Sequence, residues 1–140
     1  MSDNPIDHLT ADEAWDVVRT SQLGRIATLH SNAPEIHPVT YVVHDEHIYF
    51  RTGTSSRLLL NTENQLVAFE VSWQMMQHIS STVIRGAVVV VSEIEKVAEL
   101  DSMPYLDFAP QQKYVWMRIA PNEVRGRRLH VIDNTPWREK

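Results

Sequence analysis

Arginines and hydroxyl side chains crowd one short stretch of the chain, YFRTGTSSRLLLNT (residues 49–62). Arg51 and Arg57 enclose threonines, serines and a glycine, between an aromatic run typical of a strand and a triplet of leucines typical of a helix. A phosphate group requires convergent N–H and O–H donors together with fixed positive charge. The arginine fork matches phosphate oxygens, and the first turn of a helix adds backbone N–H groups and a favourable dipole. The stretch therefore predicts an anion site.

The same residues allow a simpler interpretation. Ser56 would be the N-cap of a short helix, and the two arginines would point into solvent. Arg57 stands in the first turn of that helix, where a cation is unfavourable unless an anion lies nearby. The stretch has no Walker-type glycine pattern, so a nucleoside triphosphate is not indicated.

Two other groups of residues could bind ions. Arg125, Arg127 and Arg128 surround Gly126 near the C-terminus, and they form either a second anion contact or an exposed strand of alternating charge. His44 and His47 could suggest a metal, but they flank a tight turn and no third ligand follows. We therefore expect surface histidines and no metal site.

An apolar cluster, Trp73–Met76, interrupts a polar connection between two predicted strands. Tryptophan and methionine are enriched at protein interfaces. The cluster is therefore either a plug for one end of a barrel or part of a contact between subunits.

The composition describes an ordinary globular domain. The chain has 140 residues, of which 43% are hydrophobic, and a net charge of −5. We expect one domain, residues 1–140, with a core of its own. The negative charge argues against nucleic-acid binding, which needs a basic face. The chain has no cysteine, no apolar run of the roughly 20 residues that span a membrane and no apolar signal core at its polar start. These features predict a cytoplasmic protein without a membrane partner.

Strands dominate the predicted secondary structure. Alternating hydrophobicity predicts strands at 25–30, 35–43, 47–52, 66–72, 82–92, 114–120 and 123–132. Helices are predicted at about 10–19, 56–62 and 94–100, the first with a Thr10/Glu13 capping box. The first three strands are expected to form a meander, and Gly86 marks a bulge or a close approach of two backbones. Since few helices separate the strands, the fold class is mainly β, with a small antiparallel barrel.

Several motifs, in their order and spacing, are similar to a known family. They are LGRIA (23–27), FRT (50–52), SRL (56–58), AFEV (68–71), VIRG (83–86) and RIAPNEVRGRRL (118–129). Over about residues 8–130 the chain resembles the pyridoxamine 5'-phosphate oxidase-like family of FMN-binding split-barrel proteins. The resemblance implies a six- to seven-stranded antiparallel split barrel. It also implies a homodimer that holds the cofactor in a groove between its subunits.

The resemblance also implies which residues contact FMN. Thr52, Ser56 and Arg57 match the phosphate contacts, and Arg51 matches a position next to the ring and the phosphate. A strand along the isoalloxazine ring and a polar contact before the fifth strand supply the other matches: His37, Pro38, Val39, Thr40 and Ser81.

The function implied is that of an FMN-dependent oxidoreductase of unknown substrate, and no catalytic residue can be named. The C-terminal substrate motif of the true oxidase is absent, which weakens the case for pyridoxamine phosphate as the substrate. Two alternatives stay open. One is a deazaflavin-dependent reductase, which the net charge of −5 disfavours because that cofactor has an acidic tail. The other is a non-catalytic carrier or sensor that binds flavin or haem.

Overall fold

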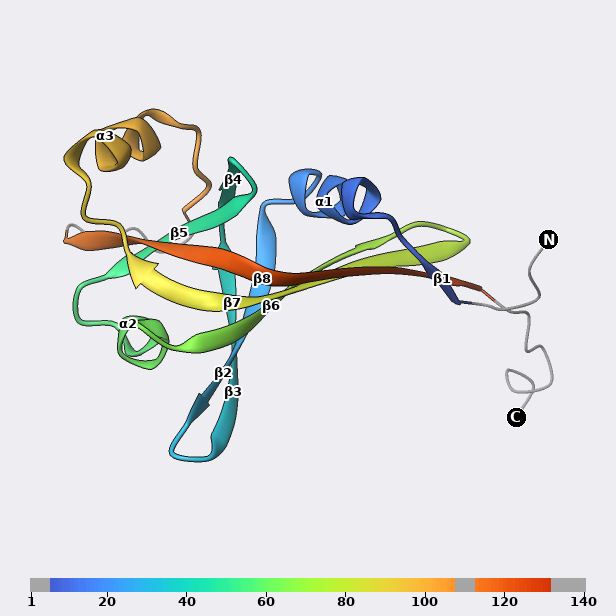
Figure 1. Cartoon of the computed structure of the whole chain (residues 1–140), viewed down its shortest axis with the longest axis horizontal. Coiled ribbons are helices and arrows are strands. Elements are labelled where there is room, and N and C mark those ends of the chain that lie inside the picture. The colour runs from blue at the N-terminus through green and yellow to red at the C-terminus, as the bar shows by residue number, and fades with distance from the viewer. Residues whose placement is uncertain (1–5, 108–112, 132–140) are drawn as a thin grey trace.

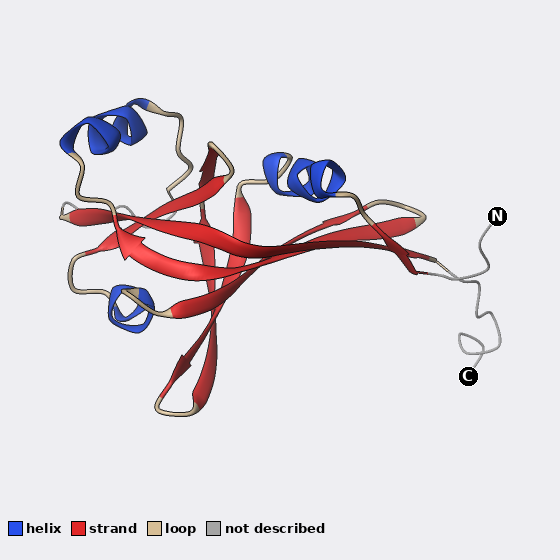
Figure 2. Ribbon diagram, viewed as in Figure 1, coloured by secondary structure: helices blue, strands red, loops and turns tan. Residues whose placement is uncertain are grey.

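The structure is a computed structural model that describes residues 6–107 and 113–131. It is mainly β and antiparallel, as predicted, with short helices packed around one sheet (Figures 1 and 2). The helices of this part of the chain are α1 (Ala11–Arg19), α2 (Arg57–Thr62) and α3 (Ile94–Ser102). Its strands are β1 (Ile6–His8), β2 (Leu23–His30), β3 (Ala33–Thr40), β4 (Val42–His44), β5 (His47–Gly53), β6 (Leu66–Gln74), β7 (His78–Val90) and β8 (Tyr114–His130).

The sheet has eight strands among the described residues, against the six to seven expected. Their order is β3-β2-β6-β7-β8-β5-β4, and β1 pairs with the far end of β8. The two outermost strands, β3 and β4, are separated in the chain only by Tyr41, so the sheet bends round on itself without a closing ladder between them. This open barrel leaves a seam beside β3 and β4.

The predicted strand 35–43 is wrong as a single strand, because the chain breaks at Tyr41. The Tyr41 backbone N–H donates to the Gln22 carbonyl at 3.1 Å, and its buried hydroxyl donates to the Val18 carbonyl at 2.6 Å. Its ring packs edge-on against Phe69, with the ring centroids 5.0 Å apart. These contacts fix the turn, so the first half of the segment pairs with β2 and the second half with β5. The expected meander is therefore two separate hairpins.

The prediction of separate strands at 114–120 and 123–132 is also wrong, because β8 runs unbroken from Tyr114 to His130; position 132 lies outside the described residues. The pairing of β8 with β7 shifts between Arg85 and Gly86, which confirms the predicted bulge. A Cβ atom on Gly86 would lie 2.1 Å from the Ala120 carbonyl oxygen, so only glycine fits this close approach.

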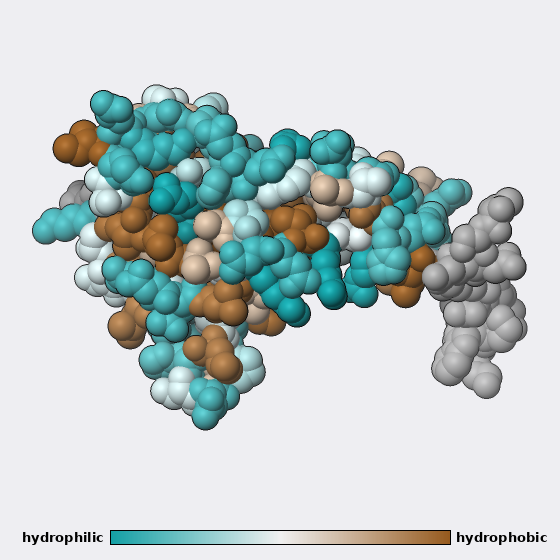
Figure 3. Space-filling view, in the orientation of Figure 1, coloured by the Kyte–Doolittle hydropathy of each residue, from teal (hydrophilic) through white to brown (hydrophobic). Residues whose placement is uncertain are grey.

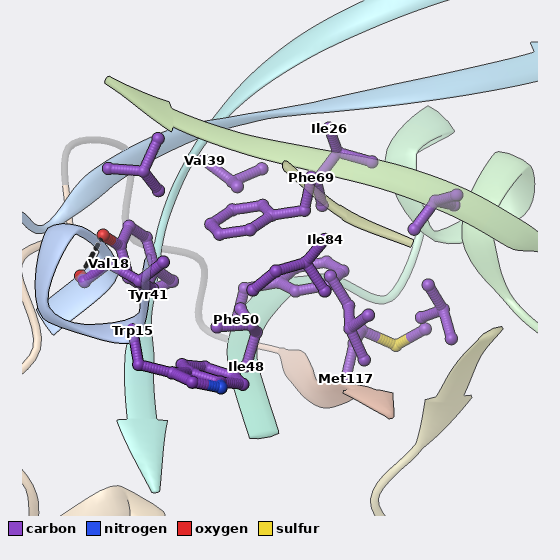
Figure 4. Close-up of a cluster of buried hydrophobic side chains, with 14 of the residues drawn as sticks. Trp15, Val18, Ile26, Val39, Tyr41, Ile48, Phe50, Phe69, Ile84 and Met117 are labelled. Atoms are coloured by element: carbon purple, nitrogen blue, oxygen red, sulfur yellow. Dashed lines mark hydrogen bonds between the residues drawn. The ribbon is translucent and has the colours of Figure 1, made fainter. Parts of the chain in front are cut away.

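In the larger of two hydrophobic clusters, side chains of α1 pack against the sheet (Figure 4). The capping box predicted for α1 is present, since Thr10 and Glu13 each accept a hydrogen bond from the backbone N–H of the other. Trp15 and Val18 on α1 point at Ile48, Phe50 and other fully buried side chains of the sheet. Burial of each such side chain contributes about 1.5–3 kcal/mol. None of the helices in the described ranges is long and apolar enough to cross a membrane.

Candidate functional site

A pocket of about 500 Å³ opens where β3, β5 and the start of α2 meet. Six of the nine predicted cofactor contacts line it: Pro38, Val39, Thr40, Arg51, Thr52 and Ser56. The other lining residues were not predicted as contacts: Leu23, Gly53, Ser55, Leu58, Tyr105, Asp107 and Tyr114. The structure thus brings most of the predicted site together in one concave surface.

Arg51 is the cation of this pocket. Its Nε and Nη2 atoms donate to one carboxylate oxygen of Asp107, at 3.2 and 3.0 Å. The guanidinium also lies against three aromatic rings, with centroids at 4.4 Å for Tyr114, 4.8 Å for Tyr105 and 5.5 Å for Trp116. Such cation–π contacts add to the hold on the side chain, which is only 21% exposed. Arg51 is thus a fixed charge and not a solvated one.

The two hydroxyls predicted as phosphate contacts lie together at the end of β5. The Thr52 and Ser56 oxygens are 2.5 Å apart, and Ser56 Oγ accepts a hydrogen bond from the Leu59 backbone N–H at 3.0 Å. Ser56 is therefore the N-cap of α2, as the simpler interpretation of the sequence predicted. It lines the pocket as well, so the two interpretations of Ser56 are compatible.

Tyr105, from the connection between α3 and β8, joins the walls of the pocket. Its hydroxyl donates to the Thr40 carbonyl at 2.9 Å and accepts from the Thr40 hydroxyl at 2.9 Å. Burial raises the pKa of Tyr105, so the phenol stays protonated near neutral pH. The neighbouring Tyr114 has a pKa raised by a hydrogen bond to Asp101.

Two predicted contacts, His37 and Arg57, lie in a second cluster around Glu35. Arg57 Nη2 lies 2.5 Å from Glu35 Oε1, and Asn61 donates to Glu35 Oε2 at 3.0 Å. His37 Nε2 is 3.3 Å from that second oxygen but makes no hydrogen bond there, and Asn61 Oδ1 has no partner in the described residues either. Arg57 is 68% exposed and does not line the main pocket. It borders an adjoining hollow of about 470 Å³ that shares Ser55 and Ser56 with the main pocket.

Ser81 is not brought to the pocket by this chain alone. It lies on the outer face of the sheet, where its hydroxyl donates to Glu70 at 3.2 Å. There it lines a groove of about 610 Å³ with Arg85, Arg125 and Arg127. Two of the three C-terminal arginines, Arg125 and Arg127, thus line this groove, and none of the three lines the main pocket.

The remaining predicted clusters are at the surface. His44 contacts Lys96 and Glu99 of α3, and no group of three potential metal ligands occurs among the described residues. Trp73 and Met76 are 47% and 97% exposed at the end of the β6–β7 hairpin, so they do not plug the barrel.

Of the seven lining residues that were not predicted as contacts, three lie far along the chain from the predicted ones: Tyr105, Asp107 and Tyr114. They come from the α3–β8 connection or from the first position of β8, and no recognisable motif includes them. No signal in the sequence could have assigned them to the site.

The fold is that of the flavin-binding split barrels. The sequence profile of the family described as pyridoxamine 5'-phosphate oxidase matches residues 10–128, so the chain belongs to that family. No curated protein matches the chain.

Solved structures agree. The chain is similar to the FAD binding protein from Mycobacterium smegmatis, with 29% identity, a TM-score of 0.83, and coverage of 90% of this chain and 100% of that one. It is also similar to a conserved protein of unknown function from Corynebacterium diphtheriae. There the identity is 27%, the TM-score is 0.77, and the match covers 91% of this chain and 100% of that one. An FAD-binding protein from Mesorhizobium loti, at 20% identity, a TM-score of 0.70 and coverage of 88% and 97%, shows the shared fold.

Proposed function

We propose that the chain is a flavoprotein that binds FMN in the 500 Å³ pocket and acts as a flavin-dependent oxidoreductase. The observation that carries this proposal is the mixed chemistry of the pocket lining. Pro38, Val39 and Leu58 supply apolar surface, and Arg51, Thr52 and Ser56 supply donors and a positive charge. A flat ring system with a phosphorylated polar tail would use both kinds of surface.

The residues present fit such a ligand without a metal or a covalent link. Apolar walls suit an aromatic ring, and small-molecule pockets of this size usually have a few placed polar groups. Arginine together with hydroxyl donors suits phosphate. A bound flavin would supply the hydride or electron transfer, while the protein binds and orients it. The substrate is not specified by any residue of the pocket.

FAD is a second candidate, because two similar proteins of solved structure are described as binding FAD. The hollow bordered by Ser55, Ser56 and Arg57 adjoins the main pocket. A second phosphate could lie there, within reach of Arg57.

We also propose a homodimer with the cofactor in a groove between subunits. The family resemblance implies that Ser81 contacts the cofactor, and Ser81 lies outside the pocket in its own chain, so that contact would have to come from a second copy. The sheet also exposes Leu29, Ile36 and Leu66 on three strands, at 63%, 69% and 66%. Figure 3 shows hydrophobic side chains at the surface of the β2–β3 hairpin. Apolar surface of this kind is typical of protein interfaces.

Native and denaturing mass spectrometry of the purified protein tests the bound flavin and the homodimer. We expect a released small molecule with the mass of FMN, or of FAD for the second candidate, and a protein mass of twice 16.1 kDa. An absorption spectrum with two visible flavin bands would agree, whereas one band at shorter wavelength would indicate a deazaflavin. A protein that carries no flavin and cannot be reconstituted with one would overturn the proposal.

A further inference from the structure

The cation of the pocket already has an anionic partner within the same pocket. Asp107 binds Arg51 through two nitrogen atoms, and its side chain is 22% exposed. Asp107 lines the pocket together with Thr52 and Ser56, the hydroxyls that would contact a phosphate. A phosphate on Arg51 would therefore meet a carboxylate at close range.

Asp107 is not the sole contact that positions Arg51. Its guanidinium is enclosed by the rings of Tyr105, Tyr114 and Trp116. Asp101 on α3 holds two of these rings. Its carboxylate accepts hydrogen bonds from the Tyr114 hydroxyl at 2.9 Å and from Trp116 Nε1 at 2.8 Å. The third ring is held by the two bonds between Tyr105 and Thr40. We therefore expect the aromatic rings to keep Arg51 in the pocket when its carboxylate partner is changed.

Among the described residues, both arginines at the pocket already have an anionic partner. Arg51 is matched by Asp107, and the nearby Arg57 is matched by Glu35. Like charges at short distance in a partly buried site repel strongly. A phosphate must either displace the Asp107 carboxylate from Arg51 or tolerate it, and a ligand without phosphate faces neither cost.

We propose that Asp107 competes with the phosphate of the ligand for Arg51, and so sets how strongly the pocket prefers a phosphorylated flavin over an unphosphorylated one. This inference rests on the proposed flavin pocket. It assigns a specificity-determining role to a residue of the α3–β8 connection.

The test compares FMN with riboflavin, which lacks the phosphate, in fluorescence titrations of the full-length protein freed of cofactor. In Asp107→Asn the carboxylate charge is lost and the size is kept. We expect this variant to bind FMN about tenfold tighter or more, since like-charge repulsion is removed, while riboflavin affinity changes less than about twofold. Asp16→Asn, the same change on the exposed face of α1 next to Arg19, should leave both affinities as in wild type.

Two results would overturn the inference. A selective loss of FMN affinity in Asp107→Asn would mean that Asp107 positions Arg51, and an equal change for both ligands would mean that it only shapes the pocket. Inorganic phosphate, followed by tryptophan fluorescence because Trp116 lies beside Arg51, separates this inference from the proposed function. If neither the wild type nor the variant binds FMN or riboflavin but Asp107→Asn gains phosphate affinity, the flavin proposal fails. The inference that Asp107 competes with phosphate for Arg51 then stands. If phosphate affinity does not rise either, both fail.

Discussion

Arg51 and Arg57 stand six positions apart in the sequence, yet they end in contrasting surroundings. Arg51 is 21% exposed, enclosed by aromatic rings and joined to Asp107 through two nitrogens. Arg57 is 68% exposed, on the first turn of α2, and contacts Glu35 through one nitrogen. The chain therefore offers one fixed cation inside the pocket and one solvated cation beside it.

This difference shows what a strand and a helix start do to the same side chain. β5 is a strand of the sheet and pairs with β8, so Arg51 is packed between the sheet and the α3–β8 connection. α2 begins at the surface, where an ion pair is worth about 0–1 kcal/mol and the side chain keeps its freedom. The family resemblance assigned a phosphate contact to Arg57 and placed Arg51 next to the ring and the phosphate. From the packing we expect Arg51 to bind a phosphate more tightly than Arg57, which would reach the ligand from outside the pocket.

The largest effect is expected from Arg51→Met, which keeps much of the apolar stem and removes the charge. Hydrogen bonds to charged groups contribute about 1.5–3 kcal/mol each. Loss of two should weaken FMN binding by roughly a hundredfold or more. The change also removes the cation that Asp107 contacts inside the pocket, so the free energy of unfolding should fall. Flavin fluorescence titration and denaturant unfolding measure the two effects.

The double variant Arg51→Met/Asp107→Asn is the control for that experiment. It removes the carboxylate charge together with the arginine, so stability should recover while FMN affinity stays low. If Arg51→Met binds FMN within about threefold of wild type, Arg51 holds only Asp107, and the contrast between the two arginines has no bearing on the ligand.

Arg57→Ala should have a smaller effect, which sharpens the comparison. An exposed contact contributes less than an enclosed one, so we expect FMN binding to weaken by about tenfold, the loss of one hydrogen bond to a charged group. Riboflavin binding should be unchanged, and so should stability within about 0.5 kcal/mol. Arg19→Ala, an exposed arginine on α1 that pairs with Asp16, is the matched control and should alter neither ligand. A loss from Arg57→Ala greater than that from Arg51→Met would reverse this ranking.

Much of the fold could be predicted from local sequence, because its signals are local. Alternating hydrophobicity located the strands, and the Thr10/Glu13 spacing located the start of α1. Gly86 marked the bulge, since no side chain fits there. The break at Tyr41 was missed because its cause is not local. It depends on contacts with Val18 and Phe69, which lie 23 and 28 residues away.

The site divides in the same way. Arg51, Thr52 and Ser56 are close in sequence, and their combination of charge and hydroxyls is enough to indicate an anion site. Asp107 lies 56 residues from Arg51, in a connection without periodicity or motif. No pattern in the sequence joins the two, so the carboxylate partner becomes visible only when the sheet brings β5 beside β8.

Glu13, in the first turn of α1, serves as a control for both arginines. Its carboxylate is hydrogen-bonded within that turn, and it does not line the pocket. Hydrogen bonds from the backbone and side chain of Thr10 lower the pKa of Glu13 below its ordinary value of 4.5. A carboxylate with a lowered pKa stabilises the folded state above that ordinary value, and its contribution is lost as the pH falls through the lowered pKa. Glu13→Gln should therefore lower the melting temperature slightly at pH 7, with a difference from wild type that shrinks below pH 4.5. Flavin affinity should not change at any pH, in contrast to the two arginine variants.

A melting difference that persists in acid would mean that the substituted amide disturbs the packing of the helix and not its charge. A change in flavin affinity would mean that effects on the pocket spread through the whole fold, and the ranking of Arg51 over Arg57 could then not be read as local contacts.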